Sequence, residues 1–239
     1  MALMPQVPPA PPITGVVFDF HHTLVHGGDA GGWLRAAWTR AGRDGSAEDA
    51  LGPDHAGVVD FLDHIWDHAR DVDPGNERDL DPRRHREVFD ATIGRVPAID
   101  PALGDALYDT AADIWEAYDD TLPILEALRD NGIRVVMLSN VGYDLGPVVK
   151  RTGIAPLLDG MVMSQALGVV KPDPRIFRAA LEVIERPPAE VLMVGDAWRD
   201  DAAAAALGIR TLVLPRTEGP VHGLELVLRL VGVSPGSRA

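Results

Sequence analysis

The sequence predicts an α/β protein: a parallel sheet flanked by helices, with an all-helical region inserted after its first strand. Two observations support this fold class. Short apolar runs alternate with helical segments over residues 121–231, and elements that alternate in this way form parallel sheets. Between an apolar run at 13–18 and that region, residues 33–119 carry apolar side chains at helical spacing and no convincing strand pattern.

The elements of the sheet can be taken in order. The first strand is expected at 13–18, where an apolar run ends at Asp19. Four further strands are expected, at 133–138, 160–163, 191–194 and 211–214. The accompanying helices are expected at 122–130, 143–152, 175–185, 201–207 and 224–231. Asn131-Gly132 and Gly208 follow two of these helices, as helix-ending residues do.

The chain therefore divides into a core and an insertion. We expect the core to comprise 13–24 and 120–233, and the helical insertion to comprise 25–119. Residues 1–12 are expected to be a disordered, Pro-rich lead-in and 234–239 a tail. The glycines within 27–32 suit a hinge; they are not followed by the Gly-Lys-Ser/Thr of a phosphate-binding loop.

Composition excludes several classes of function. The chain has 239 residues and a net charge of −14, which argues against nucleic acid or an anionic membrane as a partner. It has no cysteine, so disulfides, thiolate metal sites and cysteine nucleophiles are excluded. No apolar run reaches the roughly 18 residues that span a bilayer, and the N-terminus lacks a basic signal-peptide region. These features favour a cytoplasmic enzyme acting on a small molecule.

Four polar residues follow expected strands or precede a helix on what should be one rim of the sheet: Asp19, Ser139, Lys171 and Asp196. Ligands of open α/β sheets bind at that rim. Each residue alone has a structural explanation, as a cap, an exposed loop residue or an acidic turn. Lys171 is distinctive because the chain has only two lysines among 22 basic residues. Together the four are difficult to explain by separate structural roles, and they predict a functional site at this rim.

These residues resemble the four motifs of the haloacid dehalogenase-like (HAD) hydrolases. The motifs read Asp19-Phe20-His21-His22-Thr23, then Leu138-Ser139-Asn140, then Lys171-Pro172-Asp173-Pro174, then Gly195-Asp196 with Asp200 and Asp201 beyond. Their order and spacing match the family over about residues 13–215. The resemblance implies a Rossmann-like core, and 25–119 is similar to the family's mobile helical (C1) cap.

The resemblance also implies a chemistry. Asp19 would be the nucleophile of a Mg²⁺-dependent phosphatase of a small phosphorylated metabolite, passing through an aspartyl-phosphate. The residues implied to bind the substrate phosphate are Thr23, Ser139, Asn140 and Lys171. The metal would be bound by Asp19, the backbone carbonyl of His21 and Asp196. Asp201, or alternatively Asp200, would contact the metal's ligands from outside the coordination sphere. Lys171 would also hold the nucleophile and the phosphate together.

His21 departs from the family pattern, which has an aspartate in this acid/base position of phosphatases. An imidazole can donate a proton and take it back. Two alternatives stay open: a degenerate HAD protein that binds a ligand or partner, and a metal-independent dehalogenase-like hydrolase that attacks carbon. The retained Asp196 favours the phosphatase over the dehalogenase. Phosphonate hydrolysis needs a cap lysine, and residues 25–119 contain none.

Other clusters of polar or aromatic residues have simpler interpretations. His21, His22 and His26 are too crowded to ligate one zinc ion and lack a fourth ligand. His64 and His68 at helical spacing are more typical of a solvated helix face than of a metal site. Trp33 and Trp38 are expected in the core of the helical insertion.

Overall fold

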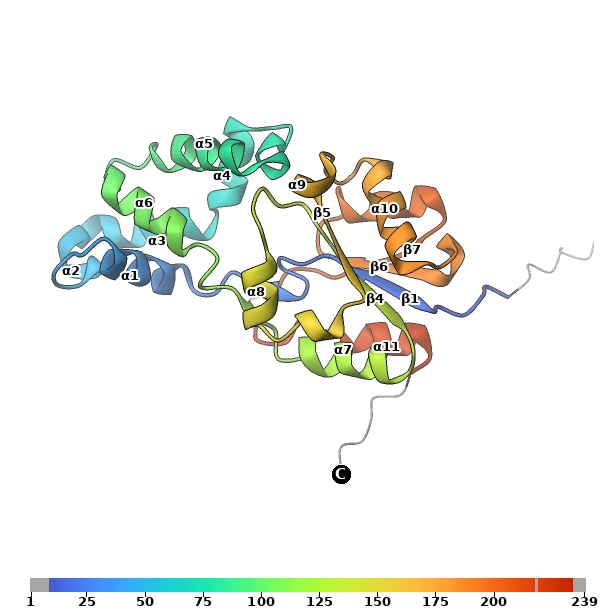
Figure 1. Cartoon of the computed structure of the whole chain (residues 1–239). Helices are drawn as coiled ribbons and strands as arrows, with labels where there is room; N and C mark the ends of the chain where they lie inside the picture. The colour runs from blue at the N-terminus through green and yellow to red at the C-terminus, as the bar shows by residue number, and fades with distance from the viewer. Residues whose placement is uncertain (1–8, 218, 234–239) are drawn as a thin grey trace, which may run out of the picture.

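The computed structural model describes residues 9–217 and 219–233, and its centre is a five-stranded parallel sheet (Figure 1). The strand order is β5-β4-β1-β6-β7. The strands are β1 Gly15–Phe18, β4 Arg134–Ser139, β5 Gly160–Met163, β6 Val191–Gly195 and β7 Arg210–Val213. β1 pairs with both β4 and β6, so the site rim is built around the centre of the sheet.

Helices cover both faces of this sheet, as the alternation of elements predicts. Alternate side chains of β1 point to opposite faces: Val16 and Phe18 to one apolar cluster, Val17 to the other. The first face is covered by α7 Thr121–Asp130, α8 Gly146–Arg151 and α11 Glu225–Val231. The second is covered by α10 Pro174–Ile184 and the 3₁₀ helix η5 Asp201–Leu207. The expected α/β fold class is confirmed.

The helical insertion, which we call the cap from here on, has its own apolar cluster and lies beyond the carboxyl end of β1 (Figure 1). Its elements are α1 Ala30–Arg40, α2 Ala47–Leu51, η1 Gly52–Asp54, α3 His55–Asp63, α4 Ile65–Val72, η2 Glu77–Leu80, α5 Pro82–Ile93 and α6 Pro101–Thr110. Trp33 and Trp38 are buried in this cluster, as expected. Asp29 begins α1 by accepting hydrogen bonds from the backbone amides of Gly31 and Gly32.

Two chain segments join the cap to the core side by side. β2 Val25–His26 pairs antiparallel with β3 Glu116–Ala117, which lies within the region where no strand was expected. A two-residue strand is too short to produce a period-two apolar pattern, so the sequence does not reveal it. The Thr121 hydroxyl fastens this joint by donating to the Leu24 carbonyl at 2.7 Å.

The remaining differences from expectation are small. α8 begins at Gly146 rather than 143, and residues 201–207 form a 3₁₀ helix rather than an α-helix. The remaining helices α9 Ser164–Leu167, η3 Ala155–Leu157 and η4 Pro188–Glu190 are short. Most of the predicted lead-in and all of the predicted tail lie outside the described residues. Within the described part of the chain, no helix has the length and apolar character to cross a membrane.

Candidate active site

The centre of the site is a buried cluster of two carboxylates around one ammonium group. The Lys171 Nζ donates to Asp19 Oδ1 at 2.6 Å and to Asp201 Oδ1 at 2.7 Å. Lys171 is 3% exposed, Asp19 7% and Asp201 0%. A cation shared between two buried carboxylates fixes the position of all three groups, because charges removed from water require close partners.

The Lys171 backbone is held by a side chain of the neighbouring strand end. Asn140 donates from Nδ2 to the Lys171 carbonyl at 3.1 Å, and its Oδ1 accepts from the Lys171 amide at 2.7 Å. Asn140 was predicted to bind phosphate. In the structure both ends of its amide group position the lysine that faces Asp19.

Asp201 is fixed from both sides as well. Its Oδ2 accepts from the Ala197 amide at 3.0 Å, while its Oδ1 accepts from Lys171. A Cβ on Gly195 would lie 2.1 Å from Asp201 Oδ2, so this close approach requires glycine at position 195. The close approach of Asp201 therefore explains why a glycine precedes Asp196 at the end of β6.

Thr23 and Ser139 contact the cluster differently. The Thr23 hydroxyl is fully buried and donates to Asp19 Oδ2 at 3.2 Å. Its partner in the structure is thus the carboxylate, although phosphate binding was predicted. Ser139 ends β4, is 3% exposed, and lines the pocket in front of Asp19. Its contact with a substrate phosphate stays a prediction.

Asp19, Asp196 and Asp201 offer oxygen atoms within 4.8 Å of one another. Carboxylate oxygens are the donors that Mg²⁺ prefers, so this set fits the divalent ion that the sequence predicts. Both oxygens of Asp201 already accept hydrogen bonds, which suits a supporting role better than direct ligation. It is the one cluster of this kind among the described residues; the histidines 21, 22, 26, 64 and 68 form none.

Asp196 has a cationic neighbour that sequence reasoning missed. The Arg216 Nε donates to Asp196 Oδ2 at 2.6 Å. The Leu214 amide donates to the Gly195 carbonyl at 2.9 Å, which extends the pairing of β6 and β7 and carries Arg216 to the rim. No sequence pattern marked this arginine, because its position depends on how far two strands pair.

Burial and charge shift the pKa values in this cluster. Burial raises the pKa of Asp19 above its usual value, and the positive charge of Lys171 opposes that shift. Burial alone would lower the pKa of Lys171, but the charges of Asp19 and Asp201 raise it well above the usual value. Lys171 is therefore charged at neutral pH.

The His21 ring lies in a stack of aromatic groups. It stacks on Trp115 with ring centroids 4.4 Å apart, and the His22 ring lies 3.9 Å away on a tilted plane. His21 Nε2 is buried and has no hydrogen-bond partner among the described residues. Burial lowers the pKa of His21 well below its usual value, and the nearby His22 and Arg216 lower it further. The free ring is therefore neutral near pH 7.

The pocket in front of Asp19 has a volume of about 140 Å³ and a wall that comes from the cap. Trp66, Arg78, Asp79 and His85 contribute to this wall. No sequence pattern indicates these residues, because they are dispersed over α4, η2 and α5. Burial raises the pKa of Asp79 to about 6, and the positive charge of Arg78 opposes part of this shift.

Two contacts hold this cap wall on the core. The Ser164 hydroxyl donates to the Asp79 carbonyl at 2.6 Å and accepts from the Val141 amide at 2.8 Å. Gly142 lies so close that a Cβ there would be 2.1 Å from the Arg78 carbonyl oxygen. Ser164 follows β5 directly, so its place at a strand end could have identified it; Gly142 could not have been identified in this way.

Comparison with known proteins agrees with this geometry. The family described as haloacid dehalogenase-like hydrolase matches residues 13–208. The chain therefore belongs to the haloacid dehalogenase-like hydrolases, and the resemblance found in its motifs is confirmed. It is a hydrolase with the α/β core of that family.

Individual relatives are moderately similar. A phosphoglycolate phosphatase of Cereibacter sphaeroides is 32% identical over 220 residues, covering 88% of this chain and 89% of that protein. The haloacid dehalogenase-like hydrolase domain-containing protein 3 of Danio rerio is 30% identical over 142 residues, 56% of this chain. That match covers 59% of the zebrafish protein, and matches to its mammalian counterparts cover less than half.

Solved structures show the same fold. The L-2-haloacid dehalogenase of Xanthobacter autotrophicus has a TM-score of 0.61 and 25% identity, with 92% of this chain and 84% of that chain covered. The phosphatase-named relatives support an enzyme of phosphatase type, and the structural likeness supports the common fold.

Proposed function

We propose that this protein is a Mg²⁺-dependent phosphatase of a small phosphorylated metabolite. The observation that carries the proposal is the Asp19–Lys171–Asp201 cluster beside Asp196. Phosphoryl transfer needs a positioned nucleophile and neutralisation of the charge on the transferred group. A buried carboxylate with a fixed ammonium group and a set of oxygen donors beside it supplies these requirements.

In the proposed reaction, a carboxylate oxygen of Asp19 attacks phosphorus and the bond to the substrate's alcohol oxygen breaks. Ser139 and Lys171 bind the equatorial phosphate oxygens, and Lys171 keeps the phosphate and Asp19 in contact. Water then attacks phosphorus, releasing inorganic phosphate and restoring the Asp19 carboxylate. Asp19, the His21 carbonyl and Asp196 would hold Mg²⁺, which when bound adds positive charge beside the transferred group.

His21 is proposed to give a proton to the leaving oxygen and then to take one from the attacking water. Its ring lines the same pocket as Asp19. The free ring is neutral because burial lowers its pKa; a bound phosphate dianion acts in the opposite direction, so in the proposed reaction the ring takes up a proton from solvent as the substrate binds and gives that proton to the leaving oxygen. Trp115 restricts the ring by stacking on it, so its orientation is set before substrate binds.

The proposal is tested by phosphate release from a panel of phosphate esters, with and without Mg²⁺, beside Asp19→Asn. We expect release that needs both Asp19 and Mg²⁺. Asp196→Asn should raise the Mg²⁺ concentration needed for half-maximal activity by tenfold or more, as on the order of 1.4 kcal/mol of lost binding does. An unchanged metal titration would contradict the assignment of Asp196.

The role of His21 is tested with two kinds of ester. His21→Ala should reduce the hydrolysis of alkyl phosphates about 10²-fold and that of p-nitrophenyl phosphate much less, because the p-nitrophenolate leaves without a proton. Equal losses on both substrates would contradict proton donation by His21.

A hydrolase that attacks carbon is the second candidate. It is favoured by the likeness to the Xanthobacter dehalogenase and by histidine, rather than aspartate, at position 21. Chloride release from 2-chloropropionate in the presence of a chelator would support it. We expect none, because the carboxylates that suit a metal are retained.

A further inference from the structure

A second, larger cleft adjoins the catalytic pocket. It has a volume of about 920 Å³, against about 140 Å³ for the pocket that contains Asp19. The two share part of their walls, contributed by His21, His22, Trp66, Trp115 and Arg216. The small pocket has room for a phosphoryl group and little more, so the larger cleft is the available space for the rest of a substrate.

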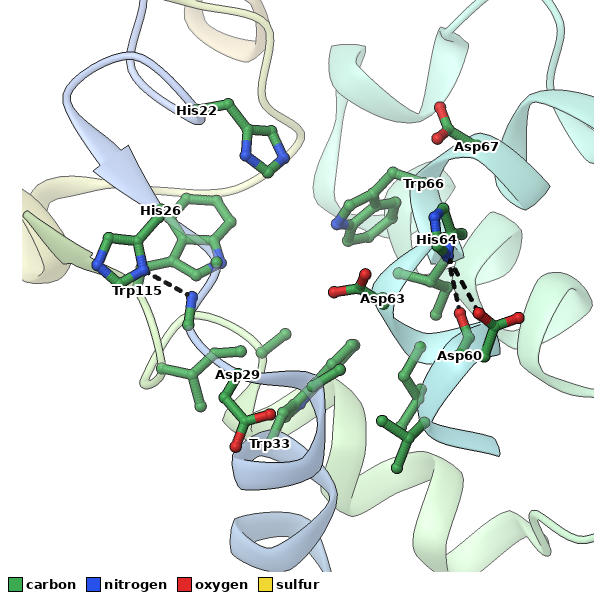
Figure 2. Close-up of a pocket in the computed structure, with 18 of the residues that line it drawn as sticks. His22, His26, Asp29, Trp33, Asp60, Asp63, His64, Trp66, Asp67 and Trp115 are labelled. Carbon is green, nitrogen blue, oxygen red and sulfur yellow. Dashed lines mark hydrogen bonds and ion pairs between the residues drawn. The ribbon is translucent and has the colours of Figure 1, made fainter. Parts of the chain in front are cut away.

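Tryptophans of the cap, and of the segment that connects the cap to the core, line this cleft. Figure 2 shows Trp33, Trp66 and Trp115 around one space. Trp33 is fixed by a hydrogen bond from its Nε1 to the Leu107 carbonyl at 3.0 Å, and Trp115 by its stack with His21. The electron-rich faces of indole rings attract cations, and quaternary ammonium groups in particular.

The charge of the same wall is negative. It carries the four aspartates 29, 60, 63 and 67, one arginine, Arg216, and the five histidines 21, 22, 26, 55 and 64. Asp29 pairs with Arg35, Asp60 with His64 and Asp67 with Arg70. The Asp63 carboxylate is exposed and makes no hydrogen bond with a described residue; its charge helps to raise the pKa of the neighbouring His64, and in Figure 2 it points into the space between the tryptophans.

The cations near the catalytic pocket are, by contrast, already paired. Arg216 donates to Asp196 at 2.6 Å, and Arg78 lies 3.8 Å from both Asp73 and Asp79. An anionic leaving group would have to displace these carboxylates and would face Asp63. A cationic one would find the exposed Asp63 carboxylate and the half-buried Trp66 ring, with the largely buried edges of Trp33 and Trp115 beside them.

A second unpaired group lies where the cleft meets the catalytic pocket. His21 Nε2 is buried without a described partner, and a Cβ on Gly27 would lie 3.3 Å from it. Gly27 lines the larger cleft. A polar atom of the substrate between the phosphate and a cationic end would meet this nitrogen, which supports a ligand that extends from one space into the other.

We infer that the larger cleft binds an ammonium group on the leaving alcohol, so that the substrates of this enzyme are phosphate monoesters of amino alcohols. The inference rests on the phosphatase activity proposed above. Asp63 and the indole faces would select the cation, while Lys171 and Ser139 bind the phosphate. A carboxylate in place of the ammonium group would be repelled by Asp63.

The test compares substrates whose leaving groups differ in charge. Phosphocholine and 3,3-dimethylbutyl phosphate have the same shape, but the second has a neutral carbon in place of nitrogen; phosphoglycolate supplies an anionic leaving group. With the Mg²⁺-loaded enzyme we expect kcat/KM for phosphocholine to exceed that for the neutral ester at least about tenfold, and phosphoglycolate to be poorer still.

Asp63→Asn should reduce the preference for phosphocholine over the neutral ester at least about fivefold. Asp54→Asn is the matched control, because Asp54 is exposed, lies in the same part of the cap and is outside the cleft wall. It should leave the preference unchanged. Equal or better hydrolysis of the neutral or anionic ester by the wild type, or a preference that Asp63→Asn does not reduce, would overturn the inference.

A binding measurement separates this inference from the proposed function. Choline chloride should quench the fluorescence of the cleft tryptophans at concentrations where 3,3-dimethylbutanol does not, and Asp63→Asn should weaken the effect. If no ester is hydrolysed but choline binds in this way, the phosphatase proposal fails and the cation site stands. If esters are hydrolysed and choline does not bind, the cation site is overturned and the phosphatase stands.

Discussion

The core and the cap both present carboxylates and cations to the active site, but they pair them differently. On the core side, Lys171 contacts Asp19 and Asp201 within 2.7 Å, and all three are buried. On the cap side, Asp79 lies 3.8 Å from Arg78, and Asp63 has no hydrogen-bond or ion-pair partner among the described residues. A wall whose charges are paired is organised before the substrate arrives, whereas a wall with unpaired charges is suited to binding one.

The difference matches the two tasks of the site. The phosphate is the same in every phosphate ester, so the core can hold a fixed arrangement for it. In the phosphatase proposed above, the leaving group differs between substrates, and the groups proposed to select it lie on the cap. Changes in the core wall should therefore reduce both stability and the reaction, while changes in the cap wall should alter selectivity or the fit of the cap.

The largest effect is expected from Lys171→Met. Asp19 and Asp201 would lose their common cation while staying buried, so the unfolding free energy at pH 7.5 should fall by about 3 kcal/mol. Activity should fall about 10³-fold, because the phosphate loses its fixed positive partner. Urea denaturation and phosphate-release kinetics measure the two effects.

Lys150→Met is the matched control for this change. Lys150 is the one other lysine of the chain and is exposed at the end of α8. Its replacement should leave stability within about 0.5 kcal/mol of the wild type and activity unchanged. If Lys171→Met were as stable as Lys150→Met, the buried cluster would not be the organised wall described above.

A smaller effect is expected where the two walls meet. An alanine Cβ at position 142 would lie 2.1 Å from the Arg78 carbonyl oxygen and 2.7 Å from the His85 Cβ, so Gly142→Ala must push the cap wall away from the core. We expect kcat/KM to fall about tenfold through misplacement of the cap groups, with a loss of about 1–3 kcal/mol in stability. Steady-state kinetics and urea denaturation measure both effects.

Gly57→Ala provides the control for adding a methyl group to a cap glycine. Gly57 lies within α3, and a Cβ there would have no neighbour within 4 Å. Helix propensity makes this change stabilising by up to about 1 kcal/mol, with unchanged kinetics. Wild-type kinetics in Gly142→Ala would show that the cap does not need this close contact.

The same contrast explains what could be predicted from the sequence. The strands that end at or just before Asp19, Ser139 and Asp196 were predicted to within a few residues, because each is a short apolar run followed by a polar residue. These residues lie at one rim because the strands are parallel, so that their carboxyl ends lie at the same edge of the sheet. Asn140 was identified as a site residue, but its contact with the Lys171 backbone depends on loop geometry that no spacing encodes.

The cap wall could not be predicted in this way. Asp63, Trp66 and Asp79 lie on separate short elements, and only the packing of α3, α4 and η2 brings them to the active site. Arg216 reaches Asp196 because β6 and β7 stay paired beyond the end of β7. Helical periodicity identifies the buried face of each cap helix, and it carries no information about which helices meet.

The smallest effect is a pH-dependent one at Asp79 of the cap wall. Burial raises its pKa to about 6. Between about pH 4 and 6 the folded protein therefore binds more protons at this residue than the unfolded chain does, so its contribution to stability falls as the pH rises. Asp79→Asn removes this penalty, and its gain over the wild type should be about 1 kcal/mol larger at pH 8 than at pH 5.

Urea denaturation of both proteins at the two pH values measures this difference. Asp54→Asn, which removes an exposed carboxylate of the same charge, controls for the change in net charge and should give a gap that is nearly the same at both pH values. A gap for Asp79→Asn that did not grow with pH would mean that Arg78 compensates the buried carboxylate fully. In that event the cap wall near the nucleophile would be as completely paired as the core wall, and Asp63 alone would distinguish the two.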